Sequence, residues 1–242
     1  MRNWAGKTYW LIGASEGLGR ALAEIMADEG ADLILSARSE DRLREVANGL
    51  SRPARIVTVD VSEAASVRAA ADMIGPIDGV VFLAGVYWPM SATEWNADDA
   101  ETMVDVNLMG AMRVLGATVP DMVQRNAGHI VLTGSLSGFR GLPGAIGYSA
   151  SKAGIMSLAE TMKSDLKATD VEVQVVNPGF IRTRLTDKNN FSMPFIMSPE
   201  DAARVMFDHM NSRKFKRSFP TVFSWLFRAS QLMPDWLYFR IF

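Results

Sequence analysis

The sequence predicts an α/β fold built on a doubly wound parallel sheet, and two patterns carry that prediction. Short runs rich in Val, Ile, Leu and aromatic residues alternate with longer amphipathic stretches over most of the chain. The short runs are continuously apolar, which is typical of strands buried on both faces. Because strands that alternate with helices are joined by right-handed crossovers, the sheet should be parallel, with helices on both faces.

The individual elements can be placed in chain order from these patterns. Strands are expected at 8–13, 32–36, 55–60, 79–85, 129–135 and 171–179, with "FKRSF" at 215–219 as a seventh candidate. Helices are expected near 17–29, 41–50, 63–74, 98–125 and 148–168. The fourth of these could break at Gly110, Gly116 and Pro120. One more helix should follow a capping box made by Ser198, Pro199 and Asp201.

Length and composition indicate one soluble globular domain. The chain has 242 residues, of which 48% are apolar and 21% charged. We place an α/β domain at residues 1–219 and a short aromatic-rich helical extension at 220–242. The absence of cysteine excludes disulfides and thiolate metal sites and suits a reducing compartment. No signal peptide and no apolar run of the roughly 20 residues that span a bilayer is found, so a cytoplasmic location is expected.

Charge is distributed unevenly along the chain. Residues 213–242 carry six basic side chains against Asp235, a net charge of +5, which leaves −7 on the remainder of a chain whose total is −2. An acidic body lacks the basic patches that bind phosphate backbones, which argues against a nucleic-acid partner.

The segment "GASEGLG" lies between the first expected strand and the first expected helix. It spaces Gly13, Gly17 and Gly19 as glycines are spaced where a pyrophosphate approaches bare backbone at a helix N-terminus. We therefore predict a dinucleotide site, with a purely structural glycine turn as the alternative.

The end of the second strand indicates which dinucleotide. A carboxylate there would bind the ribose hydroxyls of NAD, whereas an arginine would meet the extra phosphate of NADP. The chain has Ala37 and then Arg38, so NADP is preferred over NAD. Glu16 opposes this preference because a carboxylate in the turn repels phosphate, and Arg38 as a solvated surface charge is the alternative.

In "YSASKAG", Tyr148 and Lys152 are four residues apart and share one helix face. An ammonium at ~4 Å and an effective dielectric of ~20 is worth about 4 kcal/mol, so we expect Lys152 to lower the pKa of Tyr148 by roughly 3 units. Ser135 ends the fifth strand at the edge where the glycine turn lies. A phenol, a hydroxyl, an ammonium and a dinucleotide site together suit hydride transfer to or from a carbonyl.

Over about residues 6–210, these motifs resemble those of the short-chain dehydrogenase/reductase family. The resemblance implies a Rossmann-type fold and an NAD(P)-dependent oxidoreductase acting on alcohols and ketones or aldehydes. It implies four catalytic residues, which are Asn107, Ser135, Tyr148 and Lys152. It also implies a set of cofactor contacts made by Gly13, Ser15, Glu16, Gly17, Leu18, Gly19, Arg38, Asp60, Val61, Ala84, Gly85, Tyr148, Lys152, Pro178, Gly179, Ile181 and Thr183.

The family mechanism assigns a role to each catalytic residue. Tyr148 would act as general acid and base while Ser135 holds the substrate oxygen. Lys152 would bind the nicotinamide ribose, and Asn107 would hold a water that links Lys152 to solvent. Ser137 is a local helper or a plain loop serine. We also expect a homo-oligomer, either a dimer or a tetramer.

Two positions depart from the family pattern. Ile12 stands where a threonine is usual, and Leu83 replaces the asparagine that supports the sheet edge in relatives. We expect local repacking around them.

The extension contains "TVFSWLFRASQLM", in which Ser224, Arg228 and Gln231 form one narrow polar stripe on an otherwise apolar helix. Three ways of burying it stay open: a wall over an apolar substrate pocket with a subunit contact, a peripheral membrane anchor, or packing on the body. Loops 86–97 and 184–197 should form the pocket rim, and their aromatic content suggests an apolar or bulky small-molecule substrate.

Two alternative functions remain, and no metal site is expected. A catalytically idle dinucleotide-binding sensor or scaffold is the main alternative, but it would predict loss of Tyr148 or Lys152. A membrane-bound lipid-modifying enzyme of the same chemistry rests only on the extension. His129 and His209 are isolated and give no metal-ligand spacing, so no metal site is expected.

Overall fold

The computed structural model describes residues 2–188 and 191–241, within which seven parallel strands form one sheet in the order β3-β2-β1-β4-β5-β6-β7. The strands are β1 (Thr8–Ile12), β2 (Asp32–Ser36), β3 (Arg55–Ile56), β4 (Gly79–Phe82), β5 (Gly128–Thr133), β6 (Val171–Pro178) and β7 (Lys216–Phe219). The chain runs outward from β1 to β3 and then returns to place β4 on the other side of β1. Ligands of open parallel sheets bind at such a reversal, at the carboxyl ends of the strands.

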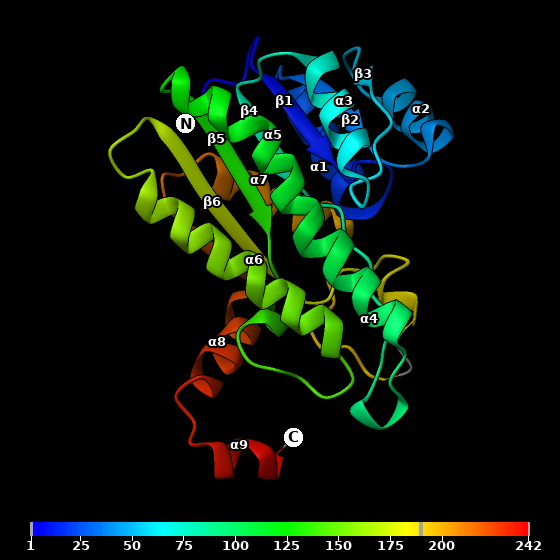
Figure 1. Ribbon diagram of the computed structural model, residues 1–242, viewed down its shortest axis with the longest axis vertical. Helices are drawn as coiled ribbons and strands as arrows, with labels where there is room; N and C mark the ends of the chain where they lie inside the picture. Colours follow the sequence, from blue (N-terminus) through cyan, green and yellow to red (C-terminus); the bar gives the residue numbers. More distant parts are fainter. Residues whose placement is uncertain (1, 189–190, 242) are drawn as a thin grey trace.

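Helices cover both faces of this sheet (Figure 1). They are α1 (Gly17–Asp28), α2 (Glu40–Gly49), α3 (Ala64–Ile74), α4 (Ala97–Val104), α5 (Gly110–Gln124), α6 (Ile146–Asp165) and α7 (Pro199–Met210). Short 3₁₀ turns lie at η1 (Ala92–Glu94), η3 (Leu136–Gly138) and η4 (Thr186–Lys188), and a π-helical turn, η2, covers Asp105–Met109. The doubly wound, single-domain α/β prediction is confirmed.

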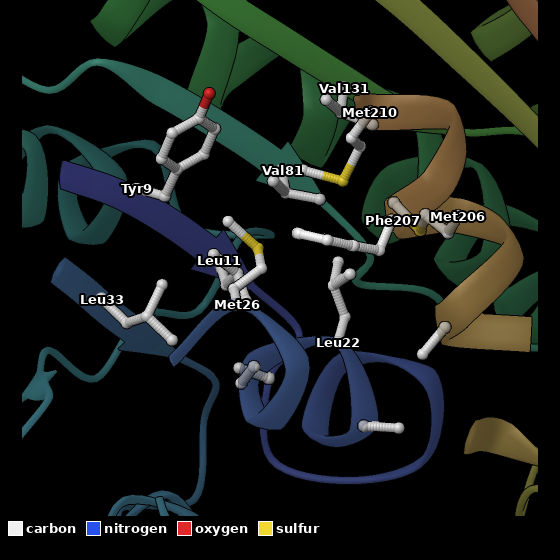
Figure 2. Packing of buried hydrophobic residues seen from close by; sticks show 14 of the residues in the cluster. Tyr9, Leu11, Leu22, Met26, Leu33, Val81, Val131, Met206, Phe207 and Met210 are labelled. Atoms are coloured by element: carbon white, nitrogen blue, oxygen red, sulfur yellow. The ribbon is translucent and has the colours of Figure 1, made fainter. Parts of the chain in front are cut away.

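Two apolar clusters account for the two covered faces. In one, Leu22 and Met26 of α1 and Phe207 of α7 pack beside Leu11 of β1 and Val81 of β4 (Figure 2). In the other, α3, α5 and α6 pack on the opposite face. Because strand side chains alternate between faces, each central strand contributes to both clusters, which explains its unbroken apolar sequence.

Three strands end two or more residues before their predicted carboxyl ends, and β1 and β6 end one residue early. Pairing stops at Ile56 rather than at residue 60, at Phe82 rather than at 85, and at Thr133 rather than at 135. The chain leaves the sheet at these points to form the loops of the carboxyl edge. Beyond β3 the contact continues only as separate backbone hydrogen bonds from Val57 and Val59 to β2 and the residue after it.

The long helix predicted at 98–125 is three segments. It changes from α4 through the π-helical turn to α5 at Gly110, whereas Gly116 and Pro120 lie inside α5 without ending it. A proline in a helix costs about 3 kcal/mol. Burial of one face of α5 in the second cluster compensates for that cost.

The helix predicted after Ser198 is present as α7. The Ser198 hydroxyl accepts a hydrogen bond from the Asp201 backbone N–H at 3.0 Å, and Pro199 is the first helical residue. The Asp201 carboxylate accepts the Ser198 hydroxyl rather than the backbone N–H of a capping box.

After β7 the chain forms α8 (Thr221–Ser230) and α9 (Asp235–Ile241), which lie beyond the carboxyl ends of the strands (Figure 1). Two residues of the polar stripe contact the body: Ser224 is buried, and Gln231 donates to the Phe139 carbonyl at 3.1 Å, whereas Arg228 is exposed. Packing on the body therefore accounts for the inner face of α8, and its apolar outer face is exposed. Within the described ranges, no helix combines the length and the apolar character needed to cross a bilayer.

Candidate active site

A cavity of about 600 Å³ lies at the carboxyl edge of the sheet, beside the loops that follow β1 and β4. Loops after β1, β2, β3, β4, β5 and β6 line it, together with α6. Every residue that the sequence predicted as a cofactor contact lines this cavity, from Gly13 in the glycine turn to Thr183 after β6. Sheet topology thus brings together side chains that are up to 170 positions apart.

The glycine turn packs more tightly than any other residue type would allow. Gly13 has φ +95°, and a Cβ there would lie 2.5 Å from the Ala84 backbone nitrogen. A Cβ on Gly19 would lie 2.1 Å from the Gly13 carbonyl oxygen. These contacts hold the start of α1 against the turn and beside the loop after β4, so the first N–H groups of α1 face the cavity edge, as a pyrophosphate requires.

Charged side chains gather where the second strand ends. Arg38 and Arg42 both line the cavity, and Arg42 lies 3.6 Å from the Glu16 carboxylate. Glu16 also pairs with Arg184, from the loop after β6. The glycine-turn carboxylate is thus neutralised by two arginines, one of which borders the place expected for a 2′-phosphate.

Asp60 lies at the same side of the cavity. Burial acts to raise the pKa of its carboxyl, but two hydrogen bonds from Ser62 and the charges of Arg38 and Arg113 together hold that pKa below its usual value. The carboxylate accepts the Ser62 backbone N–H at 2.9 Å and the Ser62 hydroxyl at 2.6 Å. Asp60 is therefore a fixed, ionised acceptor at neutral pH.

Tyr148 lies two residues into α6, and Ser135 lies just past the end of β5. The Ser135 hydroxyl accepts hydrogen bonds from Ser137, from its backbone N–H at 3.2 Å and from its hydroxyl at 2.9 Å. Burial raises the pKa of Tyr148 to about 12, and a hydrogen bond with Ser135 opposes that rise. The phenol therefore carries its proton at neutral pH.

Lys152 is buried, and its Nζ donates to the Thr133 carbonyl at 2.9 Å. Burial lowers the pKa of Lys152 to about 8. The prediction that Lys152 lowers the pKa of Tyr148 is wrong in this structure. The ammonium is directed at the end of β5 and lies 5.6 Å from the Tyr148 ring centre, so burial of the phenol decides its pKa.

Asn107 lies in the π-helical turn and is fully buried. Its side-chain amide pairs with both backbone groups of Val86, at 2.7 and 3.0 Å, and donates to the Ser151 hydroxyl at 3.0 Å. A Cβ on Gly85 would lie 3.4 Å from the Asn107 Oδ1 and 3.7 Å from the Lys152 Nζ. Asn107 in the π-helical turn therefore points inward. Its side chain fixes the loop after β4 beside Lys152.

A second cavity of about 510 Å³ adjoins the first, and Tyr148 lines both. The walls of the second are mostly aromatic and aliphatic, with Ser135 and Tyr148 at one end and Phe223 and Phe227 of α8 at another. Both predicted rim loops contribute, through Tyr87 and through Leu185, Thr186 and Phe191. Residues 189–190 of the second loop lie outside the described residues.

Some contacts of the site residues were not predicted individually from the sequence. Tyr87 makes an edge-on contact with Tyr148, with ring centres 5.0 Å apart, and Ser151 binds Asn107. Arg42, in the first turn of α2, lines the same cavity as Arg38, which precedes the helix. The four-residue spacing of Arg38 and Arg42 could be seen in the sequence. The contacts of Tyr87 with Tyr148 and of Ser151 with Asn107 depend on the fold.

Both departures from the family pattern have apolar surroundings in this chain. Leu83 packs against the first apolar cluster, and Ile12 is buried in the second. The Leu83 backbone N–H still donates to the Ile12 carbonyl at 2.8 Å. The backbone contact between β1 and the residue after β4 therefore reaches both positions, and both side chains pack in apolar surroundings.

Comparison with known proteins gives a consistent result. A family model described as "short chain dehydrogenase" matches residues 7–193. A protein of Myxococcus xanthus named an uncharacterized oxidoreductase is 35% identical over 98% of this chain and 97% of its own length. Another uncharacterized oxidoreductase, from Staphylococcus epidermidis, is 36% identical over 75% of this chain and 80% of its own.

Solved structures are similar over most of the chain. A short chain dehydrogenase/reductase from Burkholderia phymatum in complex with NAD has a TM-score of 0.87 at 27% identity, covering 94% of each chain. An alcohol dehydrogenase from the archaeon Thermococcus sibiricus, complexed with 5-hydroxy-NADP, has a TM-score of 0.79 at 26% identity, covering 88% of this chain and 95% of its own.

Proposed function

The chain belongs to the short-chain dehydrogenase/reductase family of oxidoreductases, and from that premise we propose that it interconverts an alcohol and a ketone or aldehyde with a nicotinamide dinucleotide. One observation carries the proposal. Tyr148 lines both the cavity of the glycine turn and the apolar cavity beside it, so its phenol lies where a bound dinucleotide and a substrate would meet.

The residues present fit such a dinucleotide. The three glycines of the turn bring bare backbone to the cavity where α1 begins, and Lys152 and Thr183 line the same cavity. When bound, the dinucleotide would supply or accept the hydride. Lys152 lies where it could bind the ribose of the dinucleotide. Asn107 holds the loop after β4, which lies beside Lys152.

Proton transfer falls to Tyr148. With its pKa raised by burial, the phenol is protonated at neutral pH and can donate to the oxygen of a carbonyl substrate. Ser135 borders the same cavity and can donate a hydrogen bond to that oxygen, while Ser137 supports Ser135. In the opposite direction the deprotonated Tyr148 phenolate would take the proton of an alcohol, and because the pKa of the phenol is high, that direction should be favoured at alkaline pH.

We extend the proposal to NADP as the preferred cofactor. Two arginines, Arg38 and Arg42, line the cavity where the extra phosphate is expected. Glu16 is the opposing charge, and its pairing with Arg42 and Arg184 reduces the repulsion that it exerts.

The substrate proposed is an apolar small molecule. None of the described residues that line the second cavity carries a charge, and six of them are phenylalanine or tyrosine. Such a wall holds apolar groups and penalises charged ones, which would lose their hydration without finding a partner. A catalytically idle dinucleotide-binding protein is the competing function, and the retained Tyr148 and Lys152 weigh against it.

Three further expectations belong to this proposal. We expect residues 1–219 to act as the catalytic domain with 220–242 as an extension, a homo-oligomer in solution, and a cytoplasmic location. Light scattering coupled to size-exclusion chromatography tests the oligomer directly.

The function is tested with a panel of alcohols of increasing chain length, incubated with NADP and with NAD and followed by absorbance of the reduced nicotinamide. Turnover that improves with apolar chain length and is faster with NADP is expected. If dinucleotide binds and no alcohol, ketone or aldehyde in the panel reacts, the idle-binder alternative replaces this proposal.

A further inference from the structure

The outer faces of α8 and α9 form an exposed apolar surface. Val222, Trp225 and Leu226, at positions i, i+3 and i+4, share the outer face of α8, and each is more than half exposed. Leu232 in the turn after α8, and Trp236, Phe239 and Ile241 in α9, are also more than half exposed. Half of the large apolar side chains that the described part of the chain exposes lie within residues 222–241. Such a concentration marks an interaction site.

This surface is held in place by the body of the protein. Arg140, from the loop after β5, donates to the carbonyls of Ser230 and Met233 and pairs with Asp235 at 2.6 Å. Its guanidinium also stacks on the Tyr238 ring, 3.9 Å from the ring centre, and the Tyr238 hydroxyl donates to the Gly141 carbonyl. The apolar face is therefore presented outward by fixed helices.

Charge around the surface is positive. Arg217, Arg228 and Arg240 are exposed, and the one acidic residue of the tail, Asp235, is neutralised by Arg140. The body, in contrast, carries a net −7. Basic side chains beside exposed tryptophans and aliphatic residues match an anionic lipid surface, where cations meet headgroups and aromatic rings lie at the acyl boundary.

We propose that α8 and α9 form a membrane-docking surface that seats the protein peripherally on bilayers containing anionic lipid, with Trp225, Leu226 and Trp236 entering the headgroup region. The inner face of α8 carries Phe223 and Phe227, which line the apolar cavity. This last step rests on the proposed function: an apolar substrate dissolved in the bilayer would then enter the cavity directly from the adjacent lipid.

A second copy of the chain is the competing occupant. A two-fold contact would set the same surface of both copies face to face. It would bring the basic residues of the two tails together without acidic partners, because Asp235 is already paired with Arg140. A lipid surface offers opposite charge to every one of these side chains, which is why we favour it.

The test is co-sedimentation of the full chain with vesicles of phosphatidylcholine alone and of phosphatidylcholine with 30% phosphatidylglycerol (~7:3). Binding to the anionic vesicles should exceed binding to the neutral ones by roughly tenfold or more and should weaken with added salt. The double variant that combines Trp225→Glu and Leu226→Glu should bind roughly tenfold or more weakly, because two inserted apolar side chains become charged. Trp236→Glu should act in the same direction.

Met73→Glu is the matched control, since Met73 is exposed on α3, away from this surface. It should bind vesicles like the unmodified chain. All variants should keep their dinucleotide affinity, so that a failure of docking is separable from a failure of the proposed function.

Two results would overturn the proposal. One is absence of binding to anionic vesicles, or binding that Trp225→Glu with Leu226→Glu leaves unchanged. The other is a lipid-free oligomer that the same double variant converts to monomer while vesicle binding stays absent, which would assign the surface to a second copy.

Discussion

Lys152 is a buried cation, and its position has a cost in stability. Burial lowers its pKa from 10.5 to about 8, so between pH 8 and 10.5 the unfolded chain holds more protons than the folded one. The free energy of unfolding therefore rises with pH across that window. Below pH 8 the full cost remains, about 3 kcal/mol for a pKa lowered by this amount.

Lys152→Met should accordingly make the protein more stable and less active. At pH 7 we expect the free energy of unfolding to rise by about 1 to 3 kcal/mol, less than the full cost because the hydrogen bond to Thr133 is lost. Urea denaturation at pH 7 measures this. Lys163→Met, at an exposed position of the same helix, is the control and should change little. A less stable Lys152→Met protein would show that the ammonium supports the fold.

Glu16 provides a second test at the scale of one side chain. Glu16→Gln should shift the ratio of kcat/KM for NADP over NAD upward by up to about fivefold, since exposed charge pairs are worth up to about 1 kcal/mol. The change removes repulsion of the phosphate and frees Arg42. Glu24→Gln, which breaks an exposed pair with Arg20 on α1 outside the cavity, is the matched control. A shift toward NAD would contradict the assignment of this corner to the phosphate.

Sequence spacing predicted the placement of these side chains better than their electrostatics. The separation of four residues correctly puts Tyr148 and Lys152 on one helix face and into one cavity. It could not show that β5 offers the Thr133 carbonyl to the ammonium, or that the phenol would be buried against Tyr87. The pKa of a group depends on such surroundings, which come from segments distant in sequence.

Elements whose ends depend on tertiary packing were harder to predict. The π-helical turn holds one extra residue per turn and places Asn107 inward, and "DVNLMG" has no residue that distinguishes it from an α-helix. The extension shows the same limit. Its polar stripe was identified correctly, but only the fold decides that Ser224 and Gln231 contact the body while Val222, Trp225 and Leu226 point outward.

Arg140 is the side chain on which the position of α9 should depend. Arg140→Ala removes two hydrogen bonds to the carbonyls that precede α9, an ion pair and a stacking contact, so residues 231–241 should loosen while the sheet stays folded. Limited chymotrypsin digestion should cleave at the tail aromatics at least about fivefold faster. Arg240→Ala, at an exposed position of α9, should digest at the unmodified rate. Equal rates for both variants would refute this anchoring role.

At the scale of the molecule, a buried polar network joins three strands of the sheet and the segment after α7. The Gln174 amide donates to the carbonyls of His209, Ser212 and Lys214, so its oxygen accepts from the His129 Nε2 at 2.8 Å. The Nδ1 of the same ring then accepts the Tyr9 hydroxyl at 2.9 Å. Both ring nitrogens of His129 are thereby hydrogen-bonded while the imidazole is neutral.

This network predicts acid sensitivity. Burial lowers the pKa of His129 to about 3, and burial also lowers the pKa of His209. Below the unfolded value near 6.5 the unfolded chain binds protons that the folded chain excludes, so stability is lost as pH falls from about 6.5. Urea denaturation between pH 7.5 and 5 should show a loss from His129 that approaches about 1.4 kcal/mol per pH unit, with a further loss of the same sign from His209. A free energy of unfolding independent of pH over that range would contradict the neutral assignment.

The architecture itself was predictable because it depends on patterns that repeat along the chain. Continuous apolar strands such as "DLILS", alternating with amphipathic helices, leave few arrangements other than a parallel sheet covered on both faces. The glycine turn then fixes which edge carries the site. The second cavity was only partly predictable, because its walls combine two rim loops, η3 and α8, which meet only after folding.

The central claim is that the Tyr148 phenol transfers the proton at the junction of the two cavities. The most direct measurement is turnover of Tyr148→Phe on the best alcohol or ketone of the panel, with dinucleotide affinity measured on the same protein. We predict a fall in kcat of about a thousandfold, within the range of general acid and base catalysis, with the dinucleotide still bound. Turnover equal to that of the unmodified protein would contradict the claim.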